Sequence, residues 1–343
     1  MKEGFRWCPH CREPHALASR FCSTTGAPLD TQLHEASPTP LAIQQHPLTG
    51  TILEHDYEIR RRIGTGGMNE VFEAKHRSTG RLVAIKIVKD KSAASAARLV
   101  RESEIVASLK HENICGIYGV GTMPDDRPYL ILERLEGETL ETTLHGGRRL
   151  SSDSALAIFK QVLRGLECAH AMGIVHRDLK PSNIFLVDRG GGVPLVKVLD
   201  FGLAYDSVRR GPRMTRPGKA AGTPRYMSPE QLIGANVTAT ADIFTVSMIL
   251  YEALSGRHPF SGTTLKELAQ GILYDREPDL TQLRAKLPFG LAAIVHAGLS
   301  KREVERPPSA TAMLRSLDRI DDMEEEPDSA DTYDTQSAAL VRF

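Results

Sequence analysis

The segment that most restricts what this chain can fold into is a short polar loop, His176–Asn183, with the sequence HRDLKPSN. It brings a carboxylate, an ammonium group and an amide together in Asp178, Lys180 and Asn183. The carboxylate can accept a proton from a hydroxyl, the ammonium can neutralise a phosphate, and the amide offers an oxygen to a hard cation such as Mg²⁺. A solvated loop would explain the polarity but not this order. The loop therefore predicts a site at which the three groups act together.

Composition sets the broad class. The chain has 343 residues, which suggests about two domains. It is 41% hydrophobic and 25% charged, as expected of a globular protein. Lys plus Arg and Asp plus Glu are both 43, so net charge gives no argument for nucleic acid or an anionic membrane. The chain has no apolar run of membrane-spanning length, and its start lacks the apolar core of a signal peptide, so we expect a cytoplasmic location.

The first thirty residues carry three of the five cysteines. Residues 1–30 resemble a small zinc ribbon, because a segment this short has no core of its own and cysteines in this spacing favour a tetrahedral metal site. Thr25 stands where the fourth ligand is expected, and the alternative is a degenerate ribbon without metal. The candidate ligands are Cys8, Cys11 and Cys22, with His15 or His10 as the fourth.

Residues 31–50, with three prolines and few large apolar side chains, are typical of a linker. Cys115 and Cys168 lie within apolar segments and are predicted to be small buried hydrophobic residues rather than nucleophiles.

A glycine-rich turn follows the linker. It lies between two strand-like runs, Tyr57–Ile63 and Glu70–Ala74. Glycines allow backbone N–H groups to approach a phosphate closely, so the pattern predicts a hairpin folded over a nucleotide. Asn69 stands where a further glycine is expected; Asn tolerates positive φ, so we expect a weakened rather than a lost function.

A single ammonium interrupts the next apolar strand, Leu82–Val88, at Lys86. A lone buried ammonium is costly, so it needs a partner. In the helix expected between residues 95 and 110, Glu102 is the one charge on an otherwise apolar stripe. A Lys86–Glu102 ion pair would explain both anomalies.

Three further elements are predicted downstream. Ser152 is a plausible N-cap for a helix running to about His170, whose apolar face belongs to the core. The apolar strand Val196–Leu199 leads into Asp200, which is well placed to hold Mg²⁺. Residues 242–254 are apolar nearly all round and predict a buried central helix.

In this order, the motifs resemble those of the eukaryotic-like serine/threonine protein kinases of bacteria. The resemblance covers about residues 51–320 and implies an α+β, two-lobed fold: a β-rich N-lobe with one long helix (51–133), then a hinge and a mainly helical C-lobe (134–320). Residues 321–343 form an acidic tail that we expect to be disordered. The resemblance also implies ATP with two Mg²⁺, or Mn²⁺, between the lobes.

The resemblance assigns a role to each site residue. Asp178 is the catalytic base, and Glu133 and Leu135 bond the adenine through their backbone, next to the gatekeeper Leu132. Catalysis and metal binding are carried by Asp178, Lys180, Asn183 and Asp200. The nucleotide is held by Ile63, Gly64, Gly66, Gly67, Val71, Ala84, Lys86, Glu102, Leu132, Glu133 and Leu135.

Asp200–Glu230 resembles an activation segment. We expect phosphorylated Thr215, or as second choice Ser207, to bind Arg177 and order the segment. The alternative is a solvated basic loop and activity without phosphorylation. The resemblance further implies that Thr223 bonds Asp178 and Lys180.

Two other functions compete with a serine/threonine protein kinase: a pseudokinase scaffold and a kinase acting on small molecules. A pseudokinase scaffold, recruiting partners through the N-terminal segment, would be supported only by Asn69 and by Ser247, which replaces a glycine usual in its motif. A kinase acting on small molecules is disfavoured by the full activation segment. Near the end of this segment, Ser228 stands in the family's usual alanine position. The predicted partners are proteins with Ser or Thr acceptors and, for phosphorylation in trans, a transient second copy.

Overall fold

The computed structural model describes residues 5–7, 14–16, 46–54, 56–92, 99–100, 103, 107–201, 224–284 and 286–325. The chain divides into two units, residues 1–47 and 48–343. In the first unit, β1 (Phe5–Trp7) pairs antiparallel with β2 (Pro14–Ala16). The candidate zinc ligands Cys8, His10, Cys11 and Cys22, and the side chain of His15, lie outside the described residues.

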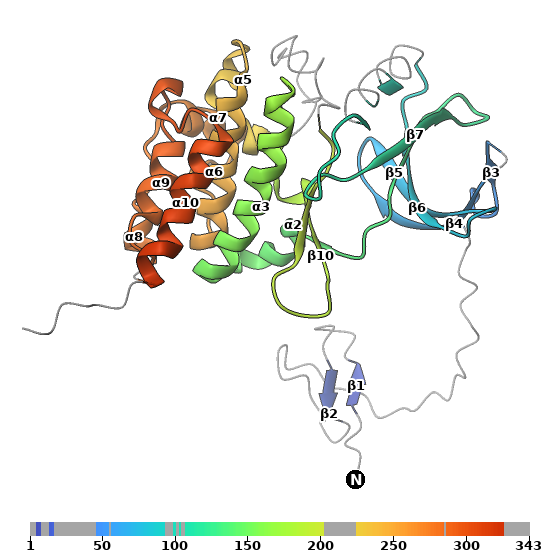
Figure 1. Ribbon diagram of the computed structural model, residues 1–343, viewed down its shortest axis with the longest axis horizontal. Helices are drawn as coiled ribbons and strands as arrows, with labels where there is room; N and C mark the ends of the chain where they lie inside the picture. Colours follow the sequence, from blue (N-terminus) through green and yellow to red (C-terminus); the bar gives the residue numbers. More distant parts are fainter. Residues whose placement is uncertain are drawn as a thin grey trace, which may run out of the picture. The chain divides into compact units, whose positions relative to one another are not determined.

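The second unit begins with a six-stranded antiparallel sheet in the order β3-β4-β5-β6-β8-β7, shown in blue to teal in Figure 1. The predicted strands are confirmed, and the turn between β4 and β5 carries the glycines. Large side chains with no exposed surface, such as Phe72 and Tyr129, form the core of this lobe. The strands are β3 (Ile52–Leu53), β4 (Tyr57–Thr65), β5 (Asn69–His76), β6 (Leu82–Val88), β7 (Ile117–Thr122) and β8 (Pro128–Glu133).

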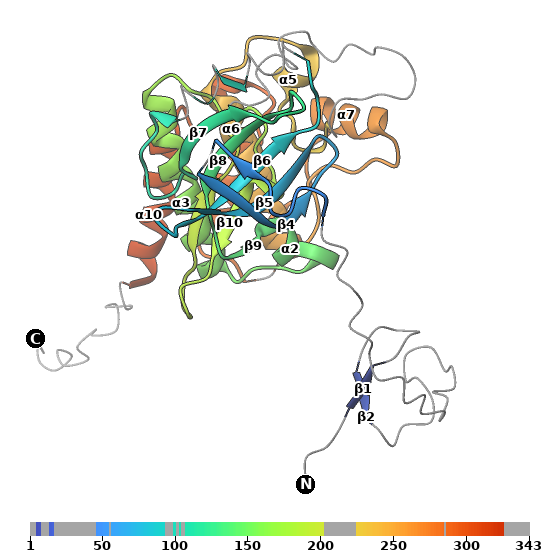
Figure 2. The same ribbon diagram turned by 90° about the vertical axis from the view of Figure 1, so that its right-hand side faces the viewer.

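The rest of the unit is mainly helical and has its own larger core. A small sheet, β11-β10-β9, lies at its edge toward the strands of the first lobe (Figures 1 and 2). Its strands are β9 (Gly137–Thr139), β10 (Ile184–Val187) and β11 (Leu195–Val198). The α-helices are α2 (Leu140–Leu144), α3 (Ser152–Ala171), α5 (Pro229–Ile233), α6 (Ala239–Ser255), α7 (Leu265–Tyr274), α8 (Leu280–Leu283), α9 (Leu291–Gly298) and α10 (Ala310–Glu325). The 3₁₀ turns are η1 (His145–Gly147), η2 (Pro181–Asn183), η3 (Pro224–Tyr226) and η4 (Glu303–Glu305).

Two helices position the loop that connects α3 to η2. The N-cap of α3 is Ser151 rather than the predicted Ser152, because the Ser151 side chain accepts the backbone N–H of Ser154. The predicted central helix is confirmed as α6, nearly all of whose residues are buried. Its cap is Thr238, so Asp242 lies inside the first turn and its carboxylate is free to bond another segment.

The C-terminal end of the fold is tied to Glu230, the last residue of the segment Asp200–Glu230. Both Arg306 Nη atoms donate to the Glu230 carboxylate, at 2.8 and 3.0 Å. Helix α10 runs to Glu325 and therefore extends five residues into the segment expected to be tail, 321–343. Among the described residues, no helix combines the length and apolar character needed to span a membrane.

Candidate active site

The Asp242 carboxylate fixes the backbone of the loop His176–Asn183. Asp242 accepts the backbone N–H of His176 at 2.8 Å on one oxygen and that of Arg177 at 3.0 Å on the other. His170, at the end of α3, lies 2.7 Å from Asp242 through Nε2. The His176 ring in turn lies 2.8 Å from the carbonyl oxygen of Leu199. The loop and the residue before Asp200 are thus fixed to one another.

Within the loop, the three predicted groups are in contact. Lys180 Nζ donates to Asp178 Oδ2 at 2.7 Å, and Asn183 Nδ2 donates to the Asp178 backbone oxygen at 2.8 Å. The Asp178 side chain is 46% exposed. Because its second oxygen is turned to neither Lys180 nor Asn183, an incoming hydroxyl can reach it. The arrangement predicted from the sequence is therefore present.

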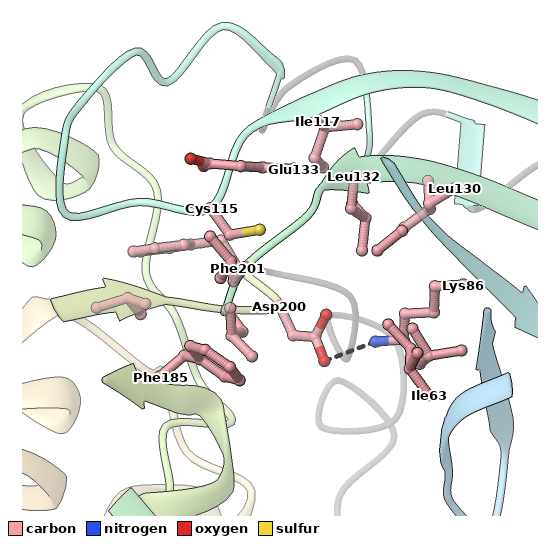
Figure 3. Close-up of a pocket in the computed structure, with 15 residues that line it drawn as sticks. Ile63, Lys86, Cys115, Ile117, Leu130, Leu132, Glu133, Phe185, Asp200 and Phe201 are labelled. Carbon is pink, nitrogen blue, oxygen red and sulfur yellow. Dashed lines mark hydrogen bonds and ion pairs between the residues drawn. The ribbon is translucent and has the colours of Figure 1, made fainter. Parts of the chain in front are cut away.

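Lys86 reaches into the same region from β6 and contacts Asp200. Its Nζ lies 2.6 Å from Asp200 Oδ2. The dashed line in Figure 3 marks this ion pair. Burial would raise the pKa of Asp200, but the Lys86 ammonium outweighs it and holds that pKa below its usual value. The lone ammonium of the apolar strand thus has a carboxylate partner. The predicted partner, Glu102, lies outside the described residues.

An apolar pocket of about 180 Å³ adjoins this ion pair (Figure 3). Six of the predicted nucleotide-binding residues besides Lys86 line it: Ile63, Val71, Ala84, Leu132, Glu133 and Leu135. The backbone N–H of Glu133 donates to the carbonyl of Gly116 at 2.9 Å. Polar groups gather at one end, at Lys86 and Asp200, so the pocket suits a flat apolar ring joined to an anionic tail.

The glycine-rich turn closes on itself through the backbone. The N–H of Gly66 donates to the carbonyl of Asn69 at 2.8 Å, and Lys89 Nζ donates to the carbonyl of Gly66 at 2.7 Å. Gly64 lies opposite Val71 in the β4–β5 pairing. Asn69 is the first residue of β5 and does not adopt positive φ, so the tolerance expected of Asn there is not used.

Comparison with known proteins identifies the family. The family model of the protein kinase domain matches residues 57–315. The chain belongs to the protein kinase family.

Curated bacterial proteins are among the relatives of this chain. It is 33% identical to the serine/threonine-protein kinase pkn3 of Myxococcus xanthus over 299 residues, covering 85% of this chain and 55% of that protein. It is 36% identical to Pkn1 of the same organism, covering 81% of this chain and 40% of that protein. The chain thus spans about half the length of these relatives, or less. A solved structure, Rad53 1–466 in complex with AMP-PNP, is similar with a TM-score of 0.61 at 27% identity, covering 76% of this chain and 65% of that one.

Two ion pairs at the hinge of this kinase were not predicted. The Glu133 carboxylate, turned away from Lys86 in Figure 3, accepts Lys197 Nζ at 2.8 Å and the N–H of Gly116 at 3.2 Å. The next residue, Arg134, donates through Nε to Glu73 of β5 at 3.0 Å. A signal was present in the sequence: Lys197 is a lone ammonium in an apolar strand, as Lys86 is.

One cysteine lies in the apolar pocket. Cys115 lines it, and burial, with added repulsion from Glu133 and Asp200, raises the pKa of its thiol to about 12. A raised pKa favours the protonated, less nucleophilic thiol at neutral pH. This agrees with the prediction that Cys115 is not a nucleophile, although it lines a pocket rather than the core.

The segment Asp200–Glu230, which resembles an activation segment, is described only at its two ends. Ser207, Thr215 and Thr223 lie outside the described residues. Arg177 is described, and its carbonyl accepts Gln231 Nε2 at 2.7 Å. Its predicted role in binding a phosphorylated residue stays a prediction.

Proposed function

We propose that this protein is a serine/threonine protein kinase that transfers the γ-phosphoryl group of ATP to a protein hydroxyl. The observation that carries the proposal is the exposed Asp178 carboxylate, flanked by Lys180 and Asn183 in a loop fixed to Asp242. A scaffold without catalysis has no need for this arrangement. The bacterial relatives named above support the same conclusion.

The proposed mechanism gives each side chain one task. Asp178 orients the acceptor hydroxyl and takes its proton, while the Lys180 ammonium, 2.7 Å from Asp178, lies where it can offset negative charge on the transferring group. Lys86 supplies a second positive charge at the end of the apolar pocket. The pocket walls exclude water from the nucleotide ring, and the hinge backbone at Glu133 and Leu135 orients it.

The residues present fit a divalent cation. The hydrogen bonds of the described residues use Asn183 Nδ2 and Asp200 Oδ2, which leaves an Oδ1 atom on each side chain. The N–H of Leu199 donates to the carbonyl of Asn183 at 2.8 Å, so the two oxygens belong to adjoining backbone segments. Asn183 and Asp200 would hold Mg²⁺, which, when bound, neutralises phosphate charge.

The test is phosphoryl transfer from Mg²⁺-ATP to a generic Ser/Thr protein substrate, measured for wild type and Asp178→Asn. We expect the variant to lose roughly 100-fold or more in rate, because it lacks the general base, while still binding ATP. Asp153→Asn, an exposed position at the start of α3, is the matched control and should keep full activity. An Asp178→Asn protein as active as wild type, or a wild type that binds ATP without transfer, would favour the scaffold.

We also propose that the kinase phosphorylates its own activation segment, with Thr215 as the main acceptor and Ser207 as the second. The phosphate would bind the Arg177 guanidinium and order the segment. Mass spectrometry of wild type and Asp178→Asn should find phosphate at these positions in wild type only. Full activity in Thr215→Ala, Ser207→Ala and the double variant would exclude the docking role. Mixing active kinase with a tagged Asp178→Asn copy tests transfer between two molecules.

For the first thirty residues we propose a zinc site with Cys8, Cys11 and Cys22 as ligands and His15 or His10 as the fourth. The support is the cysteine spacing in a segment too short to have a core. Elemental analysis of the full chain should give about one zinc per molecule, and Cys8→Ser should lose it. Zinc-free wild type would identify a degenerate ribbon.

A further inference from the structure

A second groove, more polar than the nucleotide pocket, lies beside the catalytic loop. It has a volume of about 390 Å³, and its walls come from α2 with η1, from Pro181, from η3, and from the end of α6 with the residues after it. Pro181 follows Asp178 by three residues in the same loop. A polypeptide whose hydroxyl reaches Asp178 therefore has neighbouring residues within reach of this groove.

Glu252, which lines the second groove, is paired with neighbouring side chains of the protein. Glu252 accepts Arg225 Nη2 at 3.0 Å on one oxygen and the Tyr226 hydroxyl at 2.7 Å on the other. Its side chain is only 16% exposed. The Arg225 backbone is fixed as well, since its carbonyl lies 2.8 Å from His258 Nε2. Glu252 is thus committed to internal partners and is not open to a cation from a substrate.

Two further guanidinium groups stand at the rim without such partners. Arg148 and Arg257 are exposed, and within the described part of the chain no carboxylate forms an ion pair with either side chain. Arg225 is 44% exposed and is paired with Glu252. Apart from this pair, the Arg and Glu side chains that line the groove are Arg148, Arg257 and the exposed Glu141. The accessible charge of the groove is therefore positive.

A close backbone contact brings the two rim arginines together. Gly256 ends α6 in the left-handed conformation, with φ 73°, and a Cβ there would lie 2.5 Å from the carbonyl oxygen of Gly147. Only glycine permits this approach. Arg148 follows Gly147 and Arg257 follows Gly256, so the contact places the two arginine residues on adjoining backbone segments. The arrangement is a built feature of the fold rather than two unrelated surface charges.

We propose that the second groove binds an anionic side chain of the protein substrate, a carboxylate or a phosphate, near the acceptor hydroxyl, through Arg148, Arg225 and Arg257. Guanidinium groups match both anions because they donate paired, charge-assisted hydrogen bonds. This inference rests on the kinase activity proposed above and names the class of substrate that this activity selects.

The test uses the full-length protein and peptides with a single Thr acceptor in an alanine-rich neutral background. Asp, phosphoserine, Lys or Ala is placed in turn at each of several positions on both sides of the acceptor, and kcat/KM is measured with Mg²⁺-ATP. We expect Asp to exceed Ala by about tenfold at one or two positions, and Lys to fall below Ala there. A larger gain with phosphoserine than with Asp would identify phosphate as the preferred anion, and the reverse would identify carboxylate.

Charge reversal then links the preference to the groove. In Arg148→Glu/Arg257→Glu the favoured residue at the same position should change from Asp to Lys, a gain that general damage to the enzyme cannot produce. The matched control is Arg315→Glu/Arg319→Glu, two exposed arginines on α10, which should keep the wild-type ratio of Asp to Ala. Both pairs are exposed, so both variants should fold, which thermal unfolding checks.

The outcomes separate the two proposals. Phosphorylation of the alanine peptide without any preference for Asp, with a preference for Lys, or with a preference that survives the reversal would overturn the anion site and leave the kinase activity standing. Failure of wild type to phosphorylate any peptide would contradict the kinase activity, and the inference with it.

Discussion

At the scale of single residues, the site depends on two backbone conformations that side chains usually avoid. Arg177 has φ 65° and Asp200 has φ 58°. Left-handed backbone at such residues costs on the order of 1–3 kcal/mol each and persists where the surroundings impose it. At Arg177 the imposing groups are Asp242, which accepts its N–H, and Gln231, which bonds its carbonyl. Asp242 therefore holds the catalytic loop in a shape that the loop would not keep alone.

We predict that Asp242→Asn lowers kcat by about 10- to 100-fold, because small displacements of a catalytic group are expensive. The two Asp242 oxygens each accept one N–H, that of His176 or that of Arg177, and an amide replaces one of these acceptors by an NH₂ donor. The KM for ATP should change little, since the nucleotide pocket is built from other residues. Steady-state kinetics measure both constants. A variant with wild-type kcat would show that Asp242 only fills space.

The same carboxylate should make stability depend on pH. Burial would raise the pKa of Asp242, but the hydrogen bond and charge of His170, with the charge and backbone N–H of His176, outweigh it and lower that pKa. A carboxyl group whose pKa is lower in the folded than in the unfolded state stabilises the folded protein at pH values above the unfolded-state pKa, which is near 3.9 for Asp. This stabilisation is lost as the pH falls through the folded-state pKa.

We predict that the difference in unfolding free energy between wild type and Asp242→Asn has its largest value at neutral pH and becomes smaller below about pH 4. Urea unfolding at several pH values measures it. Asp153→Asn, exposed on α3, should show no comparable trend. A difference that stays constant down to pH 3 would contradict the assigned role of the charge.

At the scale of elements, the crossing of α6 and α9 is set by one pair of small residues. Ser247 is fully buried in α6, and its hydroxyl donates to the carbonyl of Ile243 at 2.8 Å. Opposite it lies Gly298 of α9, where an added Cβ would overlap Ser247 Oγ and come within 2.8 Å of the Ser247 Cβ. The serine that departs from the family motif is thus accommodated by a glycine on the neighbouring helix.

We predict that Gly298→Ala costs about 1–3 kcal/mol through overpacking. Ser247→Gly in the same chain should recover most of this loss, because it removes the atoms that the added methyl group would meet. Denaturant unfolding of the single and double variants forms a double-mutant cycle. Additive effects in the cycle would show that the two residues do not share a contact.

Elements were predicted well where local pattern decides them. The strands of the first lobe and the buried α6 follow from apolar periodicity. The contact between Ser247 and Gly298 could not be predicted, because it depends on how two helices far apart in sequence cross. The partner of Lys86 illustrates the same limit: a buried ammonium predicts that a carboxylate is near but does not say which of several residues supplies it.

At the scale of the whole molecule, one buried ion pair connects distant parts of the helical lobe. Glu230 and Arg306 are 4% and 3% exposed and are joined by two hydrogen bonds. Arg306 also donates to the carbonyl of Ser300 at 2.8 Å and lies over the ring of Phe244. The end of the activation segment is thus fixed to the segment before α10.

We predict that Arg306→Met destabilises the protein by about 3–5 kcal/mol, since it leaves the Glu230 carboxylate buried and unpaired. Arg302→Met is a matched control: Arg302 pairs with Glu305, but both side chains are exposed, 73% and 47%, so its loss should cost under about 1 kcal/mol. Thermal or urea unfolding compares the two. Equal effects would mean that burial does not set the strength of these pairs.

The hinge ties have a consequence for how the cleft opens. Glu133 is bound to Lys197 on one side of the cleft and Arg134 to Glu73 on the other. Lys197 and Glu73 are only 10% exposed, so dissolved ions screen these contacts weakly. A movement that separates the two lobes at the hinge must break these ion pairs, which dissolved salt screens only weakly. Nucleotide release should therefore respond strongly to temperature and weakly to ionic strength.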